Sequence, residues 1–122
     1  MNKLIDIDCV LVMCTVPDAQ LAEQLARTVV QQQLAACVTI LSPGLSVYQW
    51  DGVLEKTTEI PLLIKTTHAG YDQLEAVIRM HHPYQVPEII ALPVCVGHLP
   101  YLTWVSQSVI STAVTQGVTA DG

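Results

Sequence analysis

Apolar residues in the first third of the chain occur first as an unbroken run and then at helical spacing. The run CVLVMCT, from Cys9 to Thr15, is typical of a central strand covered on both faces. The helical repeat that follows consists of Leu21, Ala22, Leu25, Ala26, Val29 and Val30. It predicts an amphipathic helix that ends near Leu34, with Pro17 in its first turn and Asp18 beside the positive end of the helix dipole. A second strand is predicted over residues 35–41.

The stretch SVYQWDGVLEKTTEIPLLIKTT predicts a long β-hairpin. Asp51 and Gly52 lie between two extended runs and suit a two-residue type I′ loop. The resulting register pairs Trp50 with Val53, Tyr48 with Glu55, and Val47 with Lys56. Continued further, it brings Pro61 opposite Ser42, and because proline cannot donate to a ladder, we expect both strands to bend or bulge near Pro43 and Pro61. The distal half of the hairpin then extends beyond the domain, where a neighbouring subunit is its natural partner.

The second half of the chain predicts helix, strand and helix. One side of the first of these helices carries Tyr71, Leu74, Val77, Ile78 and His81. Pro83 disfavours helical dihedrals for the residue before it, so this helix is expected to end at His81. A strand follows over 88–96, where Pro93 indicates an edge or an irregularity. A last helix opens near Pro100 and runs to about Val109.

The order strand, helix, long hairpin, helix, strand, helix predicts an α+β, ferredoxin-like βαββαβ fold with an extra C-terminal helix. Two helices should cover one face of an antiparallel sheet. We expect a single domain over residues 1–122, with a core at 8–111 and a frayed tail at 112–122.

Composition adds an expectation about assembly and partners. Of the 122 residues, 51% are hydrophobic and only 13% are charged, so some apolar surface should meet another subunit in a homo-oligomer. The formal net charge of -6 disfavours nucleic acid and anionic membranes and mildly attracts cations. No segment has the length of a membrane span, and Asp6 and Asp8 interrupt the apolar start, which favours a core strand over a signal peptide. Four cysteines without a C-x-x-C pair are typical of a reduced, cytosolic protein.

The sequence contains no GxGxxG, P-loop, HExxH or G-x-S-x-G motif, so we expect no enzyme. Cys14 ends the first strand just before a helix start, where the dipole favours a thiolate, and thiolate with imidazole suits copper or zinc. The alternative is that Cys14 is a small buried hydrophobe. Glu59 shares a strand face with Glu55, as solvated strand carboxylates commonly do.

Two adjacent histidines in RMHHPYQVPE leave two interpretations open. In the first, His81 lies on the packed face of its helix and, when protonated, stabilises the helix end by about 0.3–1 kcal/mol. In the second, the exit before Pro83 lets His81 and His82 converge on one ion, with a third ligand from elsewhere. Adjacent histidines are not a recognised metal spacing.

Four segments in this order, VMCTVPD, LAACVTILSPGLSVYQWDGVLEKTTEIPLLIKTT, HHPYQVPEIIALPV and YLTWV, resemble the CutA divalent-cation tolerance family. The resemblance extends from Cys9 to about Ser111 and implies a ferredoxin-like, PII-like fold that assembles as a homotrimer through its sheets. It also implies copper-site residues at Cys14, His81 and His82, and a carboxylate near the metal at Glu59. Pro61 departs from the pattern, because a residue able to donate to the ladder is expected there.

The resemblance therefore implies a cytoplasmic trimeric protein that binds copper, zinc or another divalent cation and contributes to divalent cation tolerance. The alternative is a PII-like signalling or scaffolding trimer, with a small ligand or partner protein in clefts between subunits lined by Tyr48, Trp50, Lys65 and Tyr84. A catalytic role for Cys14 ranks third.

Overall fold

A computed structural model describes residues 7–110 of the chain. The expected fraying of residues 112–122 lies outside these described residues. In chain order the elements are β1 (Val10–Val16), α1 (Ala19–Gln31), β2 (Cys37–Ile40), β3 (Gly44–Trp50), β4 (Val53–Thr66), α2 (Tyr71–His81), β5 (Ile89–Pro93) and α3 (Leu99–Ser108).

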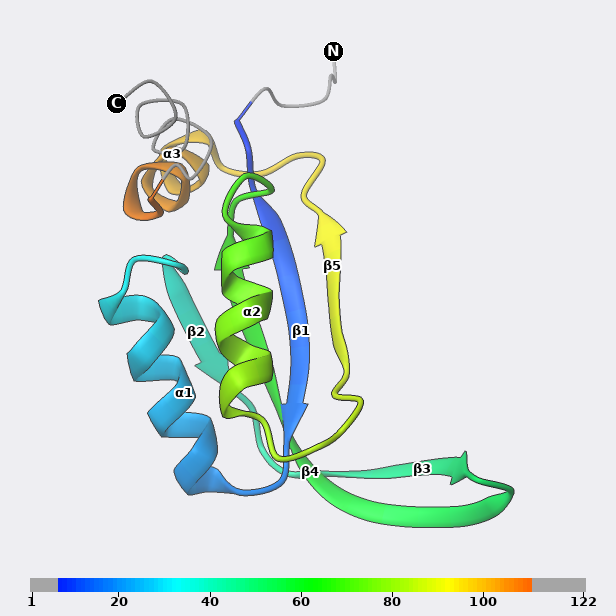
Figure 1. Cartoon of the computed structure of the whole chain (residues 1–122). Coiled ribbons are helices and arrows are strands. Elements are labelled where there is room, and N and C mark those ends of the chain that lie inside the picture. Colours follow the sequence, from blue (N-terminus) through cyan, green and yellow to red (C-terminus); the bar gives the residue numbers. More distant parts are fainter. Residues whose placement is uncertain (1–6, 111–122) are drawn as a thin grey trace.

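The strands form an antiparallel sheet in the order β2-β4-β1-β5, and β3 pairs with β4 beyond the edge of this sheet. Helices α1 and α2 lie side by side over one face, and α3 lies at the end of the sheet opposite β3 (Figure 1). The predicted α+β, ferredoxin-like order with an added helix is thereby confirmed.

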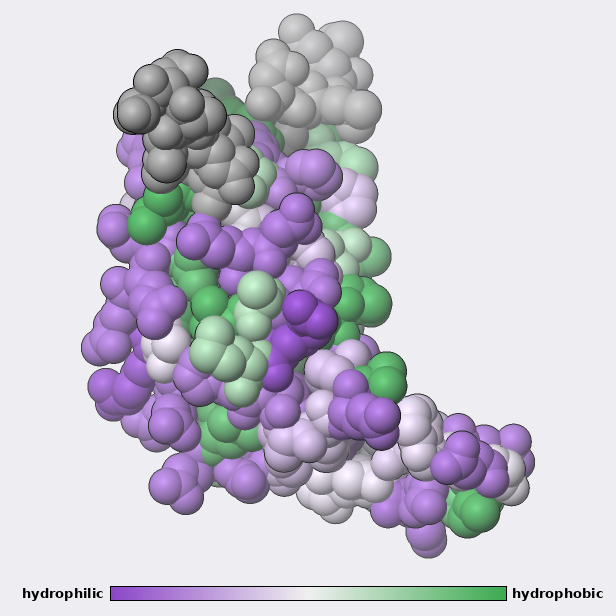
Figure 2. All heavy atoms as spheres, viewed as in Figure 1, coloured by the Kyte–Doolittle hydropathy of each residue, from purple (hydrophilic) through white to green (hydrophobic). Residues whose placement is uncertain are grey.

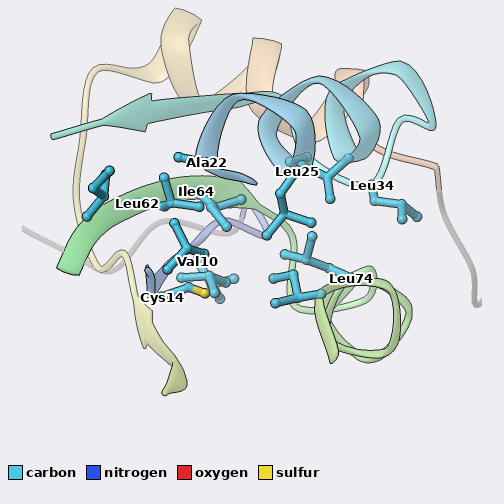
Figure 3. Packing of buried hydrophobic residues seen from close by; sticks show 14 residues of the cluster. Val10, Cys14, Ala22, Leu25, Leu34, Leu62, Ile64 and Leu74 are labelled. Atoms are coloured by element: carbon cyan, nitrogen blue, oxygen red, sulfur yellow. The ribbon is translucent and has the colours of Figure 1, made fainter. Parts of the chain in front are cut away.

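The main core fills the space between the sheet and helices α1 and α2. Buried residues from both helices and from β1 and β4 meet there, including Val10, Cys14, Leu25, Ile64 and Leu74 (Figure 3). Burial along β1 alternates strictly, with Val10, Val12, Cys14 and Val16 buried and the residues between them half-buried. The prediction of a central strand is confirmed. Within the described residues the helices cover one face of this strand, because α1 and α2 pack on the same side of the sheet (Figure 1).

Both ends of α1 differ slightly from the prediction. Asp18 is the N-cap, and its carboxylate accepts a hydrogen bond of 2.8 Å from the Leu21 amide, so Pro17 lies outside the helix. The helix ends at Gln31, short of Leu34, because Gln33 adopts a left-handed φ of 60°. That turn returns Leu34 to the core, where it is 4% exposed.

The β3–β4 hairpin follows the predicted register residue by residue, from Trp50↔Val53 through Val47↔Lys56. Both loop residues have positive φ, 53° at Asp51 and 78° at Gly52, as a type I′ turn requires. We call β3 together with residues 53–59 of β4 the arm. It projects away from the body of the domain (Figures 1 and 2).

The predicted break lies between β2 and β3, which are separated by residues 41–43. Between β2 and β3 there is one residue more than the predicted register allows, so Pro61 lies opposite Leu41 and not opposite Ser42. The Leu41 amide donates a hydrogen bond of 3.0 Å to the Pro61 carbonyl. β4 nevertheless runs through Pro61 without interruption. Within a strand, the N–H and C=O of one residue point to the same side. The backbone nitrogen of Pro61, which carries no hydrogen, therefore points toward the residue just after the end of β2, where no ladder bond is lost.

The arm carries many apolar side chains in contact with solvent. Those exposed are Leu45, Val47, Tyr48, Trp50, Val53 and Leu54.

No helix within residues 7–110 is both long and apolar enough to cross a membrane.

Candidate functional site

His82 is the C-cap of α2 and lies buried at 8% exposure, against the end of β1. Its Nε2 is 2.7 Å from the Thr15 carbonyl oxygen, and its Nδ1 is 3.2 Å from the Tyr84 amide nitrogen. A carbonyl only accepts and an amide N–H only donates, so the ring is the neutral tautomer with its proton on Nε2. Both ring nitrogens are therefore engaged, and neither has a free lone pair for a metal.

No strand supplies a hydrogen-bond donor to the Thr15 carbonyl, because the β1–β5 ladder ends before it. β5 pairs with β1 only as far as Cys14↔Ile89, and Thr15 is the next residue of β1 beyond that ladder. The imidazole of His82 takes the place of the missing strand, and its ring packs at 4.7 Å from the ring of Tyr84. His82 thus attaches the segment after α2 to the end of β1.

His81 has the opposite environment. Its side chain is exposed, and its Nδ1 lies 2.9 Å from the Val77 carbonyl oxygen. Nδ1 must therefore donate, and in the neutral ring this leaves the lone pair of Nε2 free. The prediction that His81 packs on the core face is wrong: the buried side continues through Leu74 and Ile78 to His82, at steps of four residues.

Cys14 lies in the core beneath the helices and is 1% exposed (Figure 3). Burial, followed by the charges of Glu88 and Glu59, raises the pKa of its thiol to about 12. The expectation that the start of α1 favours a thiolate is wrong, because desolvation outweighs the helix dipole here. The environment of Cys14 is that of the alternative, a small buried hydrophobe.

Glu59 lies at the root of the arm and is only 7% exposed, whereas Glu55 is exposed. The interpretation of Glu59 as a solvated strand carboxylate is therefore wrong. The Tyr84 hydroxyl forms a hydrogen bond with it. Burial, then this bond and the charge of Glu59, raise the pKa of Tyr84 to about 12, so the phenol stays protonated and donates to the carboxylate.

A groove of about 670 Å³ lies between the arm and the segment that follows α2. Its lining residues are Thr15, Ser46, Val47, Tyr48, Trp50, Glu55, Glu59, Tyr84, Gln85, Val86 and Glu88. The structure thus brings together three of the four residues predicted to line a cleft, Tyr48, Trp50 and Tyr84. Lys65 lies elsewhere, with its Nζ donating to Thr39 Oγ1 at 3.2 Å across β2 and β4.

The four candidate metal ligands do not converge within one chain. Among the described residues, no group of three or more His, Cys, Asp or Glu side chains is close enough to hold a metal ion. Of these four residues, only His81 is exposed and has a potential metal-ligand atom, Nε2, that takes part in no hydrogen bond. A complete metal site thus needs ligands from outside a single copy of this region.

Sequence reasoning missed the Thr15 carbonyl and Glu88. A backbone carbonyl has no signature in a sequence, so nothing could have indicated Thr15. Glu88 follows Pro83 and Pro87 in a segment that has to turn back toward the sheet, and this turn could have placed its carboxylate near the arm.

Comparison with known proteins gives consistent matches. The family model described as CutA1 divalent ion tolerance protein matches residues 10–108. The divalent-cation tolerance protein CutA of Citrobacter koseri is 42% identical over 101 residues, which cover 83% of this chain and 88% of that protein. The crystal structure of CutA from Xylella fastidiosa has 43% identity and a TM-score of 0.82, covering 84% of this chain and 99% of that one. A structure described as the periplasmic divalent cation tolerance protein CutA of Archaeoglobus fulgidus has 29% identity and a TM-score of 0.81, with coverages of 84% and 99%.

Proposed function

The chain belongs to the CutA1 divalent ion tolerance family, and we propose that it contributes to divalent cation tolerance by binding a cation, copper above all, through His81. The observation that carries this proposal is the state of the His81 ring. Its Nδ1–H is held by the Val77 carbonyl at 2.9 Å, and its Nε2 is free. Metal-binding histidines are commonly oriented by such a bond from the other ring nitrogen, and imidazole suits copper and zinc.

In this proposal the remaining ligands come from neighbouring copies in a homotrimer. Support for assembly comes from the exposed apolar arm and from β5, whose outer edge has no strand partner among the described residues. β5 also exposes Ile90 at 49% and Leu92 at 47%. Open edges and contiguous apolar surfaces of this kind are covered in stable proteins. We place the trimer in the cytoplasm because all four cysteines are free thiols.

The other three residues implied by the resemblance have different roles in this proposal. His82 attaches the segment after α2 to β1, Cys14 fills the core, and Glu59 belongs to the groove. In the competing arrangement His82 and Cys14 also bind the ion. For His82 to bind the ion, one of its ring nitrogens has to give up its hydrogen bond. For Cys14 to bind it, a buried thiol with a pKa of about 12 has to lose its proton.

Calorimetric titration with copper and zinc tests the proposal on wild type and on His81→Ala, His82→Gln and Cys14→Ser. Loss of one imidazole ligand should weaken binding about tenfold or more. We expect this loss in His81→Ala only. Unchanged affinity and stoichiometry in His81→Ala would refute the proposal, and a loss in His82→Gln or Cys14→Ser would favour the competing arrangement.

The groove favours a second candidate function, a PII-like role in which a small molecule binds at the root of the arm. Its volume of about 670 Å³ is within the usual range for small-molecule sites. Native mass spectrometry of protein taken from its own cells tests this candidate. A retained organic molecule would support it, and protein that carries metal alone would count against it.

A further inference from the structure

The charged residues that line the groove are all acidic: Glu55, Glu59 and Glu88. Glu59 is the buried member, at 7% exposure. Both ion pairs found among the described residues lie on helices, Arg27 with Glu23 and Arg79 with Glu75. Glu59 therefore has no cationic partner within residues 7–110.

Hydrogen bonding compensates Glu59 only in part. An ionised carboxylate can accept about four hydrogen bonds, and the one that the described residues supply comes from the Tyr84 hydroxyl. A buried carboxylate without a counter-ion is unfavourable, and pairing with a cation relieves that penalty. The structure thus leaves a buried negative group facing an open groove.

The shape and lining of the groove favour an organic cation over a metal ion. Within the described region, no three side chains of the metal-binding types converge, and about 670 Å³ is far more space than one ion requires. Tyr48, Trp50 and Tyr84 line the same groove. Aromatic faces attract diffuse organic cations such as ammonium groups and also contact their apolar parts.

Both walls of the groove are held in place without a ligand. On the arm, the Tyr48 hydroxyl hydrogen-bonds Thr57 Oγ1 at 3.0 Å. On the opposite wall, His82 holds the Tyr84 amide and the end of β1. Groups that are already ordered lose less conformational entropy on binding, which favours affinity.

We propose that this groove binds a small organic cation that carries an ammonium group on an apolar body, with Glu59 as the anionic partner. Trp50 and Tyr48 contact the apolar part and the diffuse charge, while Glu55 and Glu88 contribute attraction from the more open part of the groove. This inference rests on the second candidate of the proposed function and names the class of its ligand.

The test uses the full chain as it assembles, with three probes of similar length: 1,4-diaminobutane, the neutral 1,4-butanediol and the dianion succinate. Binding is followed by calorimetry and by tryptophan fluorescence, because Trp50 lines the groove. Glu59→Gln keeps the shape of the side chain and removes its charge. Glu23→Gln removes one negative charge from an exposed position on α1 and serves as the matched control.

We expect 1,4-diaminobutane to bind, Glu59→Gln to weaken that binding about tenfold or more, and Glu23→Gln to leave it unchanged. Glu88→Gln, at an exposed position outside the arm in the same groove, should also weaken binding, and it keeps the test decisive if Glu59→Gln fails to fold. Equal binding of butanediol or succinate would overturn the choice of an organic cation but keep a small-molecule role. No binding of any probe would overturn this inference, whereas the small-molecule role itself would still be decided by native mass spectrometry. The variant His81→Ala should bind the diamine normally, which separates this site from the metal proposal.

Discussion

Replacement of each adjacent histidine by alanine should separate their roles by stability. His82→Ala removes a donor to the Thr15 carbonyl and an acceptor for the Tyr84 amide. A buried group left without its partner costs about 1–3 kcal/mol, and the lost ring contact at 4.7 Å adds about 0.5–1.5 kcal/mol. Because Thr15 and Tyr84 are only half-buried, we expect values near the lower limits for both groups and a total of about 2.5–4 kcal/mol.

His81→Ala should cost far less. The ring is exposed and makes one hydrogen bond, within its own helix. Loss of a favourable charge at the helix end is worth at most about 1 kcal/mol. The two variants should therefore differ by about 1.5–4 kcal/mol, although the residues are neighbours of the same type.

Urea unfolding followed by circular dichroism gives these free energies. All variants must be compared at one protein concentration, because assembly contributes to the apparent stability. His82→Gln serves as a control, since its amide can donate toward Thr15 and should recover part of the loss. Equal free energies of unfolding for the two alanine variants would refute the assignment of His82 as a structural residue.

The remaining predictions concern the thiols, the arm and its turn. Iodoacetamide should modify exposed Cys95 rapidly and leave Cys14 unmodified at neutral pH, because Cys14 is buried and its pKa is about 12; equal rates by mass spectrometry would contradict this. Folding raises the pKa of the Cys14 thiol from 9.0 to about 12. The contribution of this thiol to stability is therefore complete below pH 9.0 and is lost as the pH rises toward 12. Above pH 9.0, the urea midpoint of wild type should fall more steeply than that of Cys14→Val. Trp50→Ala should weaken the oligomer in light scattering at low concentration, and Met80→Ala, exposed on α2, should not; an unchanged oligomer in Trp50→Ala would count against assembly through the arm. Gly52→Val places a β-branched side chain at a φ of 78° and should lower the free energy of unfolding by about 1 kcal/mol or more, whereas an unchanged urea midpoint would show that the turn tolerates it.

Local chemistry was sufficient to predict the hairpin and the end of α2. Asp51 and Gly52 can adopt the two positive φ values of a type I′ turn, and the turn then sets the register of the whole arm. Pro83 disfavours helical dihedrals for His82, and the helix ends at His81. Both features depend on residues that are adjacent in the chain.

The candidate site was harder to predict because it depends on residues far apart in the sequence. The burial of Cys14 under α1 and α2 decides its protonation, and a helix start next to it says nothing about that cover. The burial of His82 in place of His81 was not predicted, because the partner of His82 is a backbone carbonyl 67 residues away. The position of Lys65 outside the groove follows from sheet pairing, which its own neighbours do not reveal.

In this account, His81 binds the metal and His82 holds the structure. Long-range ¹H–¹⁵N NMR of the histidine rings, recorded with and without zinc, tests this claim most directly. It reports which ring nitrogen carries the proton and which one meets the metal. We expect His82 to be protonated on Nε2 and unaffected by zinc, and His81 to be protonated on Nδ1 with a large zinc-induced shift at Nε2. A zinc-induced shift at either nitrogen of His82, with His81 unchanged, would contradict the account.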